Sequence, residues 1–265
     1  MIDKNKIAIL TTVANFELYS HTSRYFPKDI KKYVIDGTNG MHGIHSIIYM
    51  MYKLKNEAID WLIMADEDVI FVQPEQIFRL INSMQDENIT VAGVRDGGVV
   101  AHRDKNPHAI NTFFSILNLN EVRQLWDKKE VLKNQYTQTN EFDDDLANLR
   151  GVYNSKSLYE PYYCFYFWLR RKGKMIWFLD SKMNKDEITN EVYFNDERLL
   201  YHTWYARSYN INEKHTKRIN KILETLDKVN LKGTYVEPIY FKDKLFYLRK
   251  TIKKYYKYLL IKLGK

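Results

Sequence analysis

Short apolar runs separated by amphipathic segments are the feature that most limits how this chain can fold. Each run is largely apolar and ends in polar residues, as strands buried on both faces of a sheet do. The runs are residues 7–10, 33–35, 61–65 and 89–93. Between them, residues 44–51 and 74–84 carry apolar side chains at helical spacing. This order predicts an α/β fold with a central, mostly parallel sheet flanked by helices.

The second half of the chain is less regular. Residues 127–157 are polar and form a long excursion. The further expected elements are an aromatic helix at 162–171 that Gly173 ends, a strand at 175–179, a short apolar run at 199–205 and helices from 211 onwards. We therefore expect one domain at residues 1–210 and a helical, basic C-terminal extension at 211–265.

The composition is that of a protein that folds in water. Hydrophobic residues make up 45% and charged residues 28% of the 265 residues, which excludes a disordered chain, a collagen-like chain and a polytopic membrane protein. The apolar stretch at 7–14 is too short for a membrane span and is more typical of a first strand than of a signal peptide. Cys164 is the single cysteine, so we expect it to be a buried thiol in a cytoplasmic protein.

Positive charge is concentrated at the C-terminus. Residues 241–265 contain nine Lys and Arg residues and one acid, Asp243, and this segment accounts for the net charge of +8 of the whole chain. Its apolar residues and interleaved tyrosines are typical of a helix lying peripherally on an anionic membrane surface, here the inner face of the membrane. A helix docked on the body with solvated lysines has the same composition. Nucleic acid is the third alternative, but no recognised module accompanies the charge, so none is expected.

Three consecutive acids interrupt an apolar run in the middle of the predicted sheet. Asp66, Glu67 and Asp68 follow residues 61–65 and precede the apolar residues 69–72. Burying these charges without a partner costs several kcal/mol, so a compensating group is expected. In an extended chain Asp66 and Asp68 point to the same side, roughly 6 to 7 Å apart, a spacing that suits a divalent cation. A solvated strand end or a helix cap is the structural alternative.

An Asp-X-Asp motif at the end of a central strand resembles the signature of the GT-A glycosyltransferases, and the similarity covers residues 5–207. The resemblance implies a Rossmann-like fold and transfer of a sugar from a nucleoside-diphosphate-sugar donor to a glycan or lipid-linked glycan acceptor. It assigns Asp66 and Asp68 to a Mn²⁺ or Mg²⁺ ion on the donor diphosphate, with Asp68 the stronger candidate, and Glu67 to the donor site. Such an ion offsets the charge that grows on the leaving phosphate.

The same resemblance implies roles for later residues. His202, in the run at 199–205, is the third metal-ligand candidate, and a neutral imidazole suits Mn²⁺ better than Mg²⁺. Glu160, just before the aromatic helix, matches the position of a carboxylate that takes the proton from the acceptor hydroxyl. A packed histidine and a plain helix cap are the alternatives for these two. The rivals for the base are Asp143, Asp144 and Asp145, which a solvated acidic loop also explains.

The resemblance also implies which residues line the substrate pocket. Donor contacts are expected from residues that follow the first, second and fourth strands: Thr11, Thr12, Val13, Asp36, Arg95 and the rest of the polar segment 95–103. Exposed loop charge explains that segment equally well. Residues 111–114 either line the acceptor side or form an edge strand. The remaining histidines lack metal-ligand spacing and are expected to be surface or structural residues: His21, His42, His45, His108 and His215.

Two other functions are open on the sequence alone. A nucleotidyltransferase acting on sugar phosphates normally has a glycine-rich loop after the first strand, which residues 11–15 lack. A noncatalytic adaptor for a membrane surface or a nucleic acid would bind without a metal and show no turnover.

Overall fold

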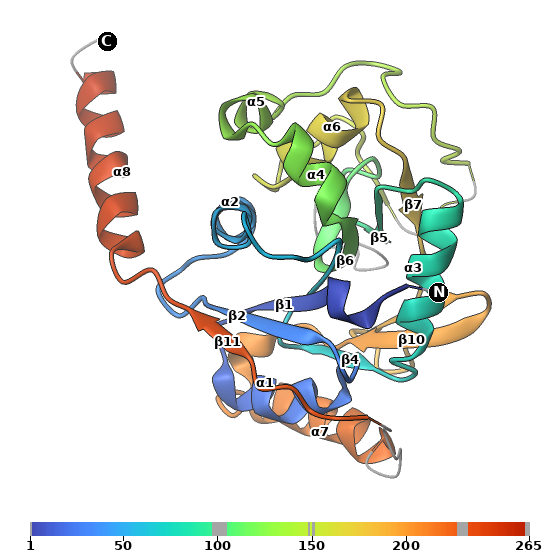
Figure 1. Ribbon diagram of the computed structural model, residues 1–265. Coiled ribbons are helices and arrows are strands. Elements are labelled where there is room, and N and C mark those ends of the chain that lie inside the picture. The colour runs from blue at the N-terminus through green and yellow to red at the C-terminus, as the bar shows by residue number, and fades with distance from the viewer. Residues whose placement is uncertain (1, 97–104, 148, 150–151, 227–232, 263–265) are drawn as a thin grey trace.

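A seven-stranded sheet forms the centre of the protein in the computed structural model, which describes residues 2–96, 105–147, 149, 152–226 and 233–262 (Figure 1). In spatial order the strands are β11 (Ile239–Phe241), β2 (Lys31–Asp36), β1 (Ile7–Val13), β3 (Trp61–Ala65), β6 (Ile110–Asn118), β5 (Val91–Arg95) and β7 (Ile176–Phe178). Neighbouring strands are parallel except that β6 is antiparallel to both β3 and β5. The predicted α/β class, with a mostly parallel sheet flanked by helices, is confirmed.

Helices cover both faces of this sheet. On one face α2 (Ile44–Lys53), α4 (Leu119–Leu125), α5 (Lys128–Lys133) and α6 (Tyr163–Arg171) pack in one buried cluster with Ala8 and Leu10 of β1. On the other face α3 (Gln76–Asp86) packs with Ile7 and Ile9 of the same strand. Side chains alternate along a strand, so consecutive residues of β1 enter different layers. Cys164 is buried in α6, as expected.

A second, smaller sheet lies beside the first. Its order is β4 (Val69–Phe71), β10 (Glu197–His202), β9 (Asn190–Phe194) and β8 (Asp180–Met183), and all pairs are antiparallel. β4 follows the acidic triplet, and its first residue, Val69, pairs with His202 at the end of β10. This pairing brings two segments that are far apart in the sequence to one place.

The structure corrects one expected strand and adds elements. β6 is a nine-residue strand inside the sheet, between β3 and β5, so an edge strand at 111–114 is wrong. The sequence pattern also missed β8, β9, α1 (Phe16–Thr22), α4 and α5, and α5 lies within the range 127–157 that was expected to be a polar excursion. Short 3₁₀ helices lie at Lys4–Lys6, Ser23–Tyr25 and Ala206–Ser208. Of the polar segment 95–103, residues 97–103 lie outside the described residues.

The C-terminal range, residues 211–265, consists of two parts. α7 (Glu213–Leu226) buries Ile219 and Leu223 against the body, and β11 adds an edge to the central sheet, with Phe241 stacked on Tyr33 at 5.5 Å. The range 211–265 therefore contains a strand as well as helices. α8 (Phe246–Lys262) projects away from the body on the side of α2 (Figure 1). No helix among the described residues has the length and apolar character needed to cross a bilayer.

Candidate active site

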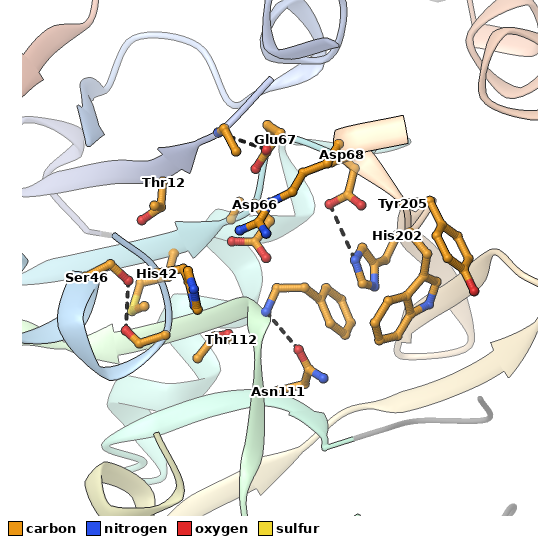
Figure 2. A pocket seen from close by; sticks show the side chains of 18 of the residues that line it. Thr12, His42, Ser46, Asp66, Glu67, Asp68, Asn111, Thr112, His202 and Tyr205 are labelled. Carbon is orange, nitrogen blue, oxygen red and sulfur yellow. Dashed lines mark hydrogen bonds and ion pairs between the residues drawn. The ribbon is translucent and has the colours of Figure 1, made fainter. Parts of the chain in front are cut away.

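A pocket of about 750 Å³ opens at the carboxyl ends of β1 and β3 (Figure 2). Its walls come from those strand ends, the segment before α2, β6, the start of α6, the β8–β9 connection and the segment after β10. The carboxyl ends of parallel strands are where open α/β sheets bind ligands. The candidate residues that line the pocket are Thr12, Asp66, Glu67, Asp68, Glu160, His202 and, from the range 111–114, Asn111, Thr112 and Phe113.

The acidic triplet occupies a tight connection between the two sheets. β3 ends at Ala65, and the Asp66 amide continues its pairing with β6 by donating to the Phe113 carbonyl at 2.8 Å. The Val69 amide then donates to the Asp66 carbonyl at 3.1 Å, and β4 begins. The chain turns within three residues, so the three carboxylates point in different directions rather than alternating along a strand (Figure 2).

Glu67 ties the triplet to the first strand. Its Oε1 accepts hydrogen bonds from the amides of Ala14 at 3.0 Å and Asn15 at 3.2 Å. Its own carbonyl accepts the Thr22 hydroxyl at 2.8 Å. Burial and the charge of Asp68 raise the pKa of Glu67, and the backbone amides only partly oppose this. Glu67 therefore lines the pocket but uses its carboxylate to hold the segment between β1 and α1.

Asp66 is half-buried in the same pocket, and it forms no ion pair within the part of the chain that the structure describes. Burial raises its pKa well above the usual range, and the charges of Glu67 and Asp68 raise it further. Arg207, which also lines the pocket, acts in the opposite direction. A bound cation would therefore stabilise the ionised forms of these carboxyl groups.

Asp68 lies beside His202, as the pairing of β4 with β10 requires. The distance from Asp68 Oδ1 to His202 Nε2 is 3.4 Å, and both side chains are almost fully buried. The Thr203 amide donates to the Asp68 carbonyl at 3.0 Å, which fixes the approach of the two segments. The imidazole stacks on Phe113, with ring centres 3.9 Å apart. Its Nδ1 is buried without a hydrogen-bond partner among the described residues, so Nε2 is the nitrogen directed at the carboxylate.

The protein side chains alone do not complete a metal centre. Among the residues that the structure describes, no group of three or more His, Cys, Asp or Glu side chains is arranged to hold a metal ion. Asp68 and His202 form a two-residue set. Mg²⁺ is commonly held by one or two carboxylates together with substrate phosphates and water, and the residues present fit that mode.

Glu160 reaches the pocket from the segment before α6. Its carbonyl accepts hydrogen bonds from the Tyr163 amide at 3.1 Å and from Gln135 Nε2 at 3.0 Å, which hold the backbone in place. The side chain is half-buried and lines the pocket with Tyr162. Glu160 therefore shares one cavity with Asp66 and Asp68, although 92 residues separate it from Asp68 in the chain.

Several predicted donor contacts lie outside the pocket. Thr11 and Val13 are buried on the side of β1 opposite to Thr12, because strand residues alternate. Asp36, at the end of β2, pairs with Lys242 at 2.6 Å and accepts a hydrogen bond from the Thr38 amide. These interactions use the side chain of Asp36 to attach the segment after β11.

Arg95 and the acidic loop also lie outside the pocket. The Arg95 guanidinium packs on the Phe178 ring at 3.6 Å and lies 3.9 Å from Asp144. Asp145 is exposed and accepts a hydrogen bond from the Ala147 amide. Asp144 is instead largely buried, with 10% of its side chain exposed, in an ion-pair network with Arg170, at 2.6 Å, and with His108.

Asp144→Asn is expected to destabilise the fold by about 3 kcal/mol, because Arg170 would lose its partner at a largely buried position. Burial alone would raise the pKa of Asp144, but hydrogen bonds from His108 and Arg170 and the charges of Arg170 and Arg95 outweigh it and lower the pKa. The stabilisation is therefore present above the unfolded pKa of about 3.9 and is lost as the pH falls below it. Urea unfolding at neutral and acid pH measures this. Asp143→Asn, at an exposed neighbour, is the control, and equal stability of the two variants would contradict the prediction.

Sequence reasoning missed other residues of the pocket. His42, expected to be a surface or structural residue, lines it, as do Arg207 and Tyr162. Asp96, expected to touch a sugar or phosphate, is buried instead and accepts hydrogen bonds from Tyr162 at 2.7 Å and Asn111 at 2.6 Å. Asp96 therefore supports two pocket residues from behind, and no local sequence signal marks such a role.

Comparison with known proteins finds solved structures that align with part of this chain. No protein-family profile and no curated protein matches this chain. A197 from STIV shares 12% identity in an alignment covering 47% of this chain and 70% of that chain, with a TM-score of 0.33. A glycosyltransferase involved in the glycosylation of the major capsid of PBCV-1 shares 16% identity, covering 56% of this chain and 81% of that chain, with a TM-score of 0.32. At this low similarity, a function has to be inferred from the side chains of the pocket.

Proposed function

We propose that this chain is a glycosyltransferase that moves a sugar from a nucleoside-diphosphate-sugar donor to a glycan or lipid-linked glycan acceptor. The observation that supports this most strongly is the placement of Asp66 and Asp68 at the carboxyl end of a central strand, in one pocket with His202 and Glu160. A pocket with an acidic floor requires a cationic partner before it can accept a diphosphate.

Asp68 and His202 are the proposed ligands of a Mn²⁺ or Mg²⁺ ion. Their opposed Oδ1 and Nε2 atoms are held in place by the β4–β10 pairing and by the Phe113 ring. Asp66 faces the same space and holds water or donor oxygens around the ion. When bound, the ion stabilises the charge that develops on the leaving diphosphate. Arg207 is the proposed direct contact to a donor phosphate, since it lines the same pocket.

Glu160 is the proposed general base. A carboxylate on a fixed backbone at the wall of the donor pocket is placed to take the proton of an acceptor hydroxyl as the new glycosidic bond forms. Asp145, its rival, lies outside the cavity.

A screen for nucleoside diphosphate release tests the proposed function. The purified protein is incubated with a panel of nucleotide sugars and Mn²⁺ or Mg²⁺, with and without simple glycan acceptors. Release from at least one donor, increased by an acceptor, is expected. Metal-independent binding with no release from any donor would favour a noncatalytic adaptor instead.

A further inference from the structure

A second, larger cavity lies between the body and α8. It is a groove of about 1330 Å³, lined by α2 on one side, by the region of α4 and α5 next to it, and by residues 242–253 on the other side. Phe246, in the first turn of α8, packs on the ring of His45 with ring centres 5.3 Å apart. Beyond this contact the α8 side chains that the structure describes are largely exposed.

Basic side chains line the groove from both sides. The body contributes Lys53, Lys55 and Lys128, and α8 contributes Lys250 and Lys253. None of these five forms an ion pair with a carboxylate of the described residues. Asp243, also in the groove, is paired with Arg249. Two sets of cations, one from the body and one from α8, therefore line the same groove, an arrangement that an anion between them stabilises.

The electrostatic effect of these lysines reaches the wall of the groove. Burial lowers the pKa of His45, and the charges of Lys250, Lys253 and Lys128 lower it further. These lysines come from both sides of the groove, so the positive potential belongs to the cavity as a whole.

The opposite side of α8 is apolar. Leu248, Ile252, Tyr255 and Leu259 are spaced four, three and four residues apart, which places them on one face of a helix. Each is more than half exposed. The basic residues Lys250 and Lys253 lie on the other face, toward the groove. α8 thus combines an unpartnered apolar stripe with a cationic face.

We propose that α8 and the groove behind it form a docking surface for an anionic lipid bilayer. The stripe of Leu248, Ile252, Tyr255 and Leu259 enters the boundary of the acyl chains, while headgroup phosphates enter the groove between α8 and the body. Charge complementarity selects this occupant, because a second copy of the chain would bring another basic surface to the same place. The proposal is independent of the transfer reaction. Met41 lines both the groove and the candidate active site, so docking holds that site near the lipid.

Vesicle sedimentation of the full-length protein tests the docking surface. Binding is expected to mixed phosphatidylcholine–phosphatidylglycerol vesicles, to weaken with salt, and to be far weaker to phosphatidylcholine alone. Lys250→Gln/Lys253→Gln, on the helix, and Lys55→Gln/Lys128→Gln, on the body, should each weaken binding by about 30-fold, since each basic residue near the surface contributes about 1 kcal/mol. Ile252→Asp should abolish it.

Matched controls come from exposed positions elsewhere. Lys214→Gln/Lys221→Gln, on α7, makes the same charge change and should leave binding intact. Ile211→Asp matches the apolar change, since Ile211 is 84% exposed.

Equal binding to neutral and anionic vesicles would overturn the proposal. So would an effect of the helix pair without the body pair, which would exclude the groove. A concentration-dependent dimer that Ile252→Asp abolishes, without vesicle binding, would assign the stripe to a second copy. Nucleoside diphosphate release by these variants reports separately on the proposed reaction.

Discussion

Asp68→Asn is expected to lower nucleoside diphosphate release by about a hundredfold or more while the protein stays folded. The change removes one of the two proposed protein ligands, and stabilisation of the leaving group by a metal contributes several kcal/mol. The charge of Asp68 raises the pKa of both neighbouring acids, so its removal relieves repulsion. The melting temperature should therefore be maintained or rise. Steady-state kinetics at saturating Mn²⁺, together with a thermal melt, measures both effects.

A matched control for Asp68→Asn is Asp180→Asn. Asp180 is an exposed acid on β8, and its carboxylate lies 3.9 Å from the Lys182 ammonium. The Asp180→Asn variant should release nucleoside diphosphate at the rate of the unmodified protein. If Asp68→Asn is as active as this control, Asp68 is not a ligand of a metal that serves the reaction.

Glu160→Gln is expected to lower transfer to the acceptor by roughly 10² to 10⁴ while leaving the KM for the donor unchanged. Glutamine keeps the size of the side chain, and the hydrogen bonds to the Glu160 backbone carbonyl are unchanged by the substitution. The variant should therefore lose the proton acceptor without moving the wall of the pocket. Transfer rates at saturating donor and varied acceptor measure the loss.

Asp145→Asn separates the two candidate bases. Asp145 is exposed and outside the pocket, so this variant should transfer normally. Normal transfer by Glu160→Gln with loss in Asp145→Asn would reverse the assignment. Normal transfer by both variants would indicate a reaction without either carboxylate as base, such as one with retention of configuration.

The central strands could be predicted because they are buried on both faces. β3 has the predicted bounds, and β1 and β2 include the predicted runs with a few residues more. The direction of β6 could not be predicted in the same way, since an apolar strand has the same local pattern whether its neighbours are parallel or antiparallel. β8 and β9 were missed because the small sheet exposes much of its surface, so residues such as Asp180 and Lys182 interrupt the apolar pattern.

The candidate site could also be predicted only in part. The acidic triplet was recognisable because charge in a buried strand is unusual. The proximity of Asp68 to His202 depends on the pairing of β4 with β10, which no local pattern indicates. Only the resemblance placed His202 among the metal-ligand candidates. The local sequence does not predict ion-pair partners that are distant in the chain, such as Lys242 for Asp36 and Arg170 for Asp144. Because these partners cannot be read from the sequence, acids with similar local sequence have different partners and different degrees of burial in the structure.

The metal dependence of nucleoside diphosphate release tests the proposed function most directly. The rate is measured for the donor that the protein accepts best, first in excess EDTA and then after Mn²⁺ is added back beyond the chelator. We predict that EDTA abolishes release, that Mn²⁺ restores it, and that Asp68→Asn is not restored under the same conditions. Full release in excess EDTA, equal to that with Mn²⁺, would contradict the assignment of Asp68 and His202 to a metal-assisted transfer.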